Sequence, residues 1–192
     1  MHNEVVFDIE TQNTFQDVGG YNTEKLKVSV VVAYFYETDE YVSYLESDLP
    51  KFFERLERGG RVIGYNSLHF DVPVLNNYYV GDLAKLQHLD LLAKINQSLG
   101  YRIKLDDVAA ATIGQRKSAH GLQAVQWWKE GKIPEIIEYC KQDVKVTKEV
   151  YEFGKDNGYI LFDDRLGERR KVDIDFHHEP CEKPVINLSM GF

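Results

Sequence analysis

The chain has 192 residues, of which 43% are hydrophobic and 28% are charged, so it can form one globular domain and is not a disordered segment. Its 31 acidic and 23 basic residues give a formal net charge of −8, which argues against nucleic-acid binding through a broad basic surface. The longest apolar run is too short for a membrane helix, and two isolated cysteines give no disulfide framework. We therefore expect a cytoplasmic protein without a membrane partner.

The N-terminal third of the chain predicts a sheet and one helix. Runs of β-branched and aromatic residues predict strands at 4–10, 26–37, 40–46 and 61–66. Residues 47–60 predict a helix, because Pro50 suits its first turn and two glycines suit its end. Three strands, a helix and a further strand favour an α/β fold with mixed strand direction.

The remainder of the chain is mainly helical until its last strands. A helix is predicted to begin near residue 70, and others at 90–100, 104–114, 120–131 and 133–155. Residues 158–176 predict a β-hairpin, with its turn in the segment DDRLGE. We divide the chain into a core at 1–157, a hairpin extension at 158–176 and a tail at 177–192.

Two carboxylates interrupt the first predicted strand. In EVVFDIET, Asp8 and Glu10 are two residues apart and therefore share one face of the strand. No Lys or Arg lies within ten residues of Asp8 on either side, so a local salt bridge is unavailable. Two carboxylates side by side repel each other, and a hard divalent cation with several oxygen ligands is the chemistry that favours such a pair.

Further acids are predicted at the ends of other elements. Asp71 follows a strand and lies in the first turn of a helix. Tyr139 and Asp143 are four residues apart, which places both on one helix face within an apolar seam. Each of these signals alone is most simply structural, but their joint occurrence on the expected elements indicates a metal-binding site.

The segments FDIET, NSLHFD and YCKQD resemble the three exonuclease motifs of the DEDD superfamily, in its tyrosine-containing branch. The resemblance spans roughly residues 4–155. That branch includes the proofreading domains of DNA polymerases and stand-alone or helicase-associated nucleases. The resemblance implies a ribonuclease H-like fold, with a central mixed five-stranded sheet flanked by helices, and leaves the C-terminal β-hairpin outside the catalytic core.

The resemblance also implies roles for individual residues. The four carboxylates of Asp8, Glu10, Asp71 and Asp143 would be catalytic and would bind two divalent cations, Mg²⁺ or Mn²⁺. Tyr139 would hold the attacking water as a fifth catalytic residue. Three residues of the first two motifs would contact the 3′ end of the substrate: Thr11, Asn66 and Phe70.

The implied activity is 3′→5′ hydrolysis of phosphodiester bonds in single-stranded nucleic acid, with DNA favoured, a role in DNA repair, and a helicase or polymerase as candidate partner. Two alternatives stay open: a non-catalytic ribonuclease H-like binding module, and a structure-selective endonuclease using the same site. His120 is a candidate phosphate ligand, although an exposed polar loop explains it as well. The segment HHEPC at 177–181 offers too few ligands for a closed zinc site. Trp127 and Trp128 lie in a predicted helix and are expected to pack in the core rather than to stack on bases.

Overall fold

The computed structural model describes residues 4–58, 60–115, 121–164 and 166–177. Its centre is a five-stranded sheet with the order β3-β2-β1-β4-β5. The strands are β1 (Glu4–Thr11), β2 (Val28–Phe35), β3 (Glu40–Leu45), β4 (Arg61–Gly64) and β5 (Gln87–Asp90). β1 pairs antiparallel with β2 and parallel with β4, so the predicted mixed five-stranded sheet is confirmed. The sequence patterns did not predict the strand at 87–90.

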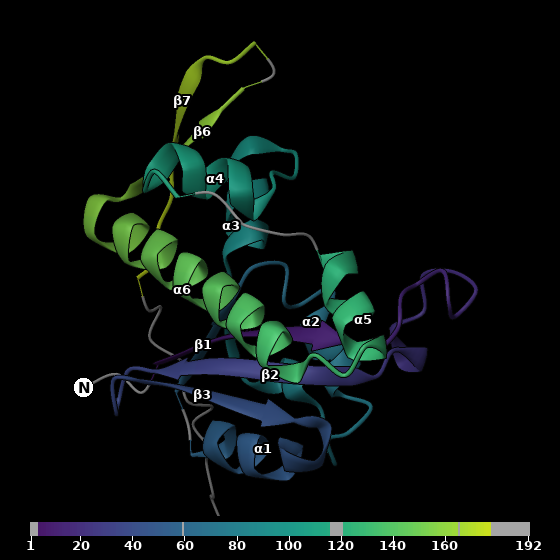
Figure 1. Cartoon of the computed structure of the whole chain (residues 1–192). Coiled ribbons are helices and arrows are strands. Elements are labelled where there is room, and N and C mark those ends of the chain that lie inside the picture. The colour runs from purple at the N-terminus through teal and green to yellow at the C-terminus, as the bar shows by residue number, and fades with distance from the viewer. Residues whose placement is uncertain (1–3, 59, 116–120, 165, 178–192) are drawn as a thin grey trace, which may run out of the picture.

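Helices cover both faces of this sheet (Figure 1). They are α1 (Leu49–Glu57), α2 (Asp71–Leu75), α3 (Leu91–Leu99), α4 (Leu105–Thr112), α5 (Gly121–Lys129) and α6 (Ile133–Asn157), with short 3-10 turns η1 (Thr23–Lys25), η2 (Glu46–Asp48) and η3 (Leu83–Lys85). α1 lies against one face, and α6 runs across the other. Within the described residues, no helix is both long and apolar enough to cross a membrane.

The alternation of side chains along β1 divides the core into two clusters. Phe7 and Ile9 pack with the apolar face of α1, whereas Val6 packs with α6. Because successive strand residues point to opposite faces, the even-numbered positions of β1 face α6. Asp8 and Glu10 therefore lie on the face that α6 covers.

The C-terminal strands form the predicted hairpin, β6 (Tyr159–Asp163) and β7 (Arg169–Asp173), which pair antiparallel. The hairpin lies away from the main sheet, beside α4 (Figure 1). After β7 the chain returns to the core, where the buried ring of Phe176 lies against Gly154 of α6. A Cβ on Gly154 would approach that ring to 2.5 Å, so only glycine permits this close packing.

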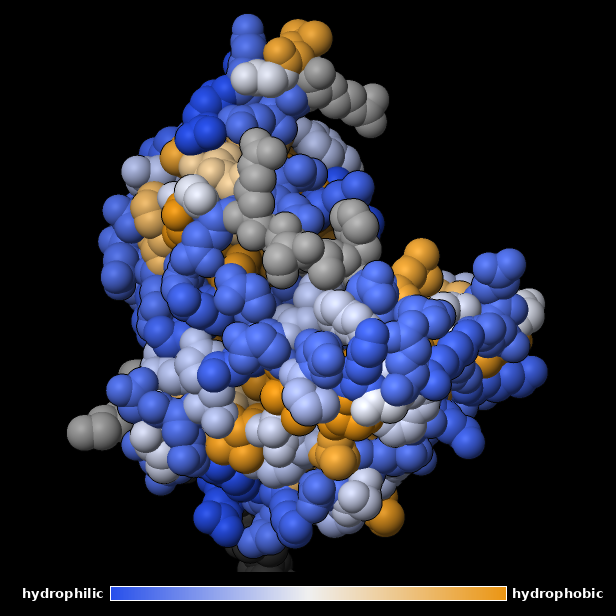
Figure 2. Space-filling view, in the orientation of Figure 1, coloured by the Kyte–Doolittle hydropathy of each residue, from blue (hydrophilic) through white to orange (hydrophobic). Residues whose placement is uncertain are grey.

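The surface seen in Figure 2 is mainly hydrophilic, with hydrophobic residues scattered between polar ones. This agrees with the composition, in which 28% of the residues are charged. Of the predicted tail at 177–192, only His177 lies among the described residues, and it is exposed. The rest of the segment 177–181, which offers too few ligands for a closed zinc site, lies outside them.

Candidate active site

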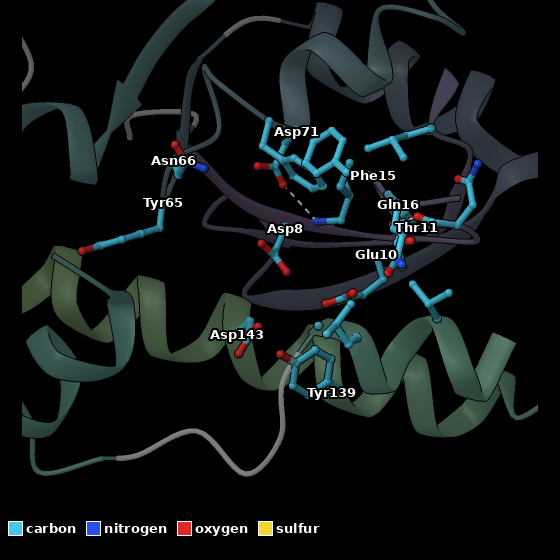
Figure 3. A pocket seen from close by; sticks show the side chains of 18 residues that line it. Asp8, Glu10, Thr11, Phe15, Gln16, Tyr65, Asn66, Asp71, Tyr139 and Asp143 are labelled. Carbon is cyan, nitrogen blue, oxygen red and sulfur yellow. Dashed lines mark hydrogen bonds between the residues drawn. The ribbon is translucent and has the colours of Figure 1, made fainter. Parts of the chain in front are cut away.

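Three carboxylates from two elements converge at the carboxyl end of β1. Asp8 and Glu10 come from the strand, and Asp143 comes from the N-terminal half of α6 (Figure 3). One ligand oxygen from each of the three lies within 4.8 Å of the other two. The structure thus brings together residues that are more than 130 positions apart in the sequence.

Tyr139 lies one helical turn before Asp143 and faces the same carboxylates (Figure 3). Burial raises the pKa of the Tyr139 hydroxyl far above its usual range, and the charges of Asp143 and Glu10 raise it further. The hydroxyl is therefore a hydrogen-bond donor at any physiological pH. The ring also meets the ring of Trp127 edge-on, at 6.1 Å between centroids, which fixes its position.

Asp71 is placed differently from the other three acids. It is the first residue of α2, and its Oδ1 accepts a hydrogen bond of 3.2 Å from the backbone N–H of Ile9 (Figure 3). β4 pairs with β1 only as far as Val6, so the side chain of Asp71 takes over as the partner of β1 beyond that point. Burial raises the pKa of Asp71 to about 7, and the charges of Asp90 and Asp143 add to the increase.

These residues line one cleft, the acidic cleft, with a volume of about 560 Å³. Its walls include the four predicted acids, Tyr139 and the three predicted substrate contacts, Thr11, Asn66 and Phe70. The ring of Phe70 meets that of Phe15 edge-on at 5.8 Å, and the Thr11 hydroxyl donates to the carbonyl of Asn13 at 2.8 Å. His120 lies outside the described residues.

Sequence reasoning missed two residues that hold the Asn66 loop in place. The carboxylate of Asp90, at the end of β5, accepts hydrogen bonds from the backbone N–H of Asn66 at 2.8 Å and of Leu68 at 3.1 Å. Asn66 has a left-handed backbone with φ of 67°, which these bonds help to maintain. Arg102 donates to the side-chain oxygen of Asn66. Asp90 also caps α3, and its position just before a predicted helix was the one feature of the sequence that could have pointed to it.

The donor set fits a hard divalent cation. Carboxylate oxygens are the ligands that Mg²⁺ and Mn²⁺ prefer, and here three of them lie close enough to share one ion. Glu10 and Asp143 are buried, so a bound cation would offset repulsion that water screens only weakly. The cluster of Asp8, Glu10 and Asp143 could therefore bind metal.

Comparison with known proteins identifies the family. A family model of the RNase H superfamily matches residues 5–153, which is more than half of the chain, so the chain belongs to this superfamily. The match supports a nuclease-type function.

Two polymerases are similar to the chain. The DNA-directed DNA polymerase of Escherichia phage T7 is 27% identical over 197 residues, covering 77% of this chain and 26% of the polymerase. The structure of the family B DNA polymerase from the hyperthermophilic archaeon Pyrobaculum calidifontis matches with a TM-score of 0.61 and 17% identity, covering 80% of this chain and 24% of that one. The chain thus spans about a quarter of the length of either polymerase. The family model and the structural match together confirm the ribonuclease H-like fold.

Proposed function

We propose that this chain is a metal-dependent 3′→5′ exonuclease of the tyrosine-containing DEDD branch, acting on single-stranded nucleic acid with DNA favoured. The observation that carries the proposal is the convergence of Asp8, Glu10 and Asp143 within 4.8 Å, beside Tyr139 in one open cleft. The similarity to two DNA polymerases supports DNA as the substrate and a polymerase or helicase as a partner.

The metal requirement follows from the chemistry of the donor set. Asp8, Glu10 and Asp143 would hold the cations, and Asp71 would support them from the edge of β1, where its side chain accepts the backbone N–H of Ile9. When bound, two divalent cations neutralise charge on the phosphate and make water a better nucleophile. The protein itself contributes a rigid frame, because Asp8 and Glu10 lie on the middle strand of the sheet and Asp143 lies on the long helix that packs against it.

Tyr139 contributes orientation rather than proton abstraction. Because its pKa is raised well above the usual value, the hydroxyl keeps its proton and cannot act as a base near neutral pH. This hydroxyl is hydrogen-bonded to Asp143, and when Asp143 holds a cation the hydroxyl would be placed to donate instead to the attacking water or to the phosphate. Packing against Trp127 holds the ring in place for this task.

One gel experiment tests the proposal. Single-stranded DNA and RNA, labelled at the 5′ end, are incubated with the protein and Mg²⁺, Mn²⁺ or EDTA. We expect a ladder of products that shorten one nucleotide at a time, faster on DNA, and no reaction in EDTA.

Three outcomes would contradict the proposal. Immediate release of a labelled mononucleotide would show 5′→3′ polarity. Cleavage of a circular single strand would favour the endonuclease alternative. Binding without cleavage under any metal condition would favour the non-catalytic module.

A further inference from the structure

A second hollow adjoins the acidic cleft. This side groove has a volume of about 410 Å³ and shares Tyr65, Asn66, Gly121 and Tyr139 with the acidic cleft as a common wall. Its other walls come from the first turn of α3, from the loop between α3 and α4, and from the first turn of α4. A ligand that leaves the acidic cleft past Asn66 therefore enters the side groove directly.

The charge of the side groove is opposite to that of the acidic cleft. Arg102 and Lys104, both exposed, line the groove, and Asp106 is the one carboxylate among its described lining residues. Within the described part of the chain, Lys104 forms no ion pair. In a chain with a net charge of −8, two cations beside an acidic cleft form a local site for an anion.

The floor of the groove is apolar. Leu92, Ile103 and Leu105 line it together with the ring of Tyr65, whose hydroxyl donates to the carbonyl of Ile103 at 2.8 Å. This hydrogen bond fixes the ring at the junction of the two hollows. An aromatic and apolar floor beside cationic side chains is the combination that binds single-stranded nucleic acid, since bases pack on the floor and phosphates meet the cations.

Arg102 also fixes which atoms Asn66 presents at the junction. A guanidinium can only donate hydrogen bonds, so the amide atom that it contacts is the oxygen of Asn66. The amide nitrogen then points toward the acidic cleft, as Figure 3 shows. The junction therefore carries a hydrogen-bond donor, which suits a phosphate or sugar oxygen passing between the two hollows.

We infer that the side groove binds the nucleotides that precede the 3′-terminal nucleotide of a single strand. The inference rests on the proposed function. Hydrolysis at the carboxylates leaves one nucleotide on the 3′ side and a continuing chain on the other, and the chain needs an exit that accepts several phosphates. The side groove is continuous with the cleft and supplies that exit. The preferred substrate is then a strand of at least three nucleotides, with Lys104 as a phosphate contact.

The variant Lys104→Ser tests this assignment without weakening the fold. Lys104 occupies the N-cap of α4 with an extended backbone and makes no side-chain cap bond there. Serine is a favourable N-cap residue, so the variant should melt at the same temperature or higher. Lys104→Asp keeps the favourable cap and reverses the charge. Lys51→Ala removes an exposed lysine from α1, on the other face of the sheet, and is the matched control.

The measurement is kcat/KM for a dinucleotide and an octanucleotide of single-stranded DNA, at low and moderate salt. We expect the wild type and Lys51→Ala to prefer the octanucleotide. Lys104→Ser should lower the ratio of kcat/KM for the octanucleotide to kcat/KM for the dinucleotide, and Lys104→Asp should lower this ratio further. Because one phosphate contact on a single strand contributes a salt slope of about 0.7, the advantage of wild type over Lys104→Ser should fall roughly two- to threefold between about 50 and about 200 mM salt.

The outcomes separate this inference from the proposed function. If the wild type cleaves the dinucleotide as fast as the octanucleotide, or if Lys104→Ser matches Lys51→Ala at both salt concentrations, the groove assignment is wrong while the exonuclease proposal stands. If the wild type cleaves neither substrate with Mg²⁺ or Mn²⁺, both are overturned.

Discussion

The two ends of β1 each place a buried carboxylate against α6, but they treat it differently. At the amino end, Glu4 accepts hydrogen bonds from the hydroxyl of Tyr151 at 2.8 Å and from Nζ of Lys155 at 3.1 Å. At the carboxyl end, Glu10 faces Asp143 and another acid within 4.8 Å. The first arrangement suits a stable core, because an opposite charge offsets the cost of burying the carboxylate. The second concentrates like charges, which is the arrangement that a cation site requires.

The spacing of the two elements explains why both ends meet the same helix. Six residues of an extended strand separate Glu4 from Glu10, which is about 20 Å. Along α6, Asp143 lies eight residues and Tyr139 twelve residues before Tyr151, which is about 12 Å and about 18 Å. β1 and α6 therefore lie alongside each other in opposite directions, so that the amino end of β1 meets the C-terminal half of α6 and the carboxyl end of β1 meets its N-terminal half. One helix stabilises the fold at its C-terminal end and supplies site residues nearer its N-terminal end.

The largest expected effect comes from removing one acid at the carboxyl end of β1. Asp143→Ala removes one of the three converging carboxylates and should lower the exonuclease rate at least about 10³-fold, or about 4 kcal/mol in activation free energy, because metal-dependent charge stabilisation carries most of the catalysis. The rate is measured on a 5′-labelled single strand with Mn²⁺. A variant that keeps more than a tenth of the wild-type rate would contradict the metal assignment.

Melting curves of the same variant provide its control. In EDTA, Asp143→Ala should be at least as stable as the wild type, since it relieves repulsion among the acids. Mn²⁺ at about a hundredfold excess over its Kd should stabilise the wild type by about 2.7 kcal/mol, a rise of roughly 5–10 °C, and should stabilise the variant less. Equal curves for the wild type in the two buffers would argue against a metal site.

The second effect concerns Asp71, whose pKa of about 7 in the folded state exceeds its ordinary value of 3.8. The folded protein binds the Asp71 proton more tightly than the unfolded chain does. The free energy of unfolding of the wild type is therefore highest below about pH 4 and falls as the pH rises toward 7. In EDTA, Asp71→Asn, which keeps an acceptor for Ile9, should match the wild type near pH 4 and become more stable between pH 4 and 7, by at most about 4 kcal/mol. Urea unfolding at several pH values measures this, and a constant difference would contradict it.

The third prediction breaks the amino end of β1. Glu4→Ala leaves Lys155 and the hydroxyl of Tyr151 without their acceptor, and should lower the free energy of unfolding by about 2–3 kcal/mol, the low end for a buried pair because Lys155 is partly exposed. The melting temperature should fall by roughly 4–12 °C. The rate per folded molecule should be unchanged, and a fall in that rate at temperatures well below melting would contradict the separation of the two ends.

Some of this comparison could be predicted from the sequence. The alternation along β1 puts Asp8 and Glu10 on one face, and the spacing of four residues puts Tyr139 and Asp143 on one helix face. These are local periodicities, which the backbone geometry of one element enforces. The convergence of the two pairs depends on packing of β1 against α6, which the resemblance to a known family implied and the structure shows.

Other parts had no local signal. β5 has only four residues, Gln87–Asp90, and half of them are only partly buried, so neither its length nor its pattern indicates a strand. The bonds from Asp90 to the loop of Asn66 and from Arg102 to the same residue join segments 24 and 36 positions apart. The pairing of Glu4 with Lys155 spans 151 positions. Such contacts follow from the tertiary fold and leave no periodic trace in the sequence.

The smallest expected effect distinguishes metal binding by the carboxylates from orientation of the attacking water by Tyr139. Tyr139→Phe keeps the ring, its burial and its contact with Trp127, and removes only the hydroxyl. If the hydroxyl orients the attacking water as a donor, its loss costs one hydrogen bond made in the transition state, about 1.4–2.7 kcal/mol or roughly 10- to 100-fold in kcat. Because the raised pKa of Tyr139 prevents it from titrating near neutral pH, the pH profile of the remaining activity should keep the wild-type shape. The measurement is kcat against pH for both proteins with Mn²⁺. A changed pH profile, or a loss as large as that of Asp143→Ala, would show that Tyr139 acts as more than a positioned donor.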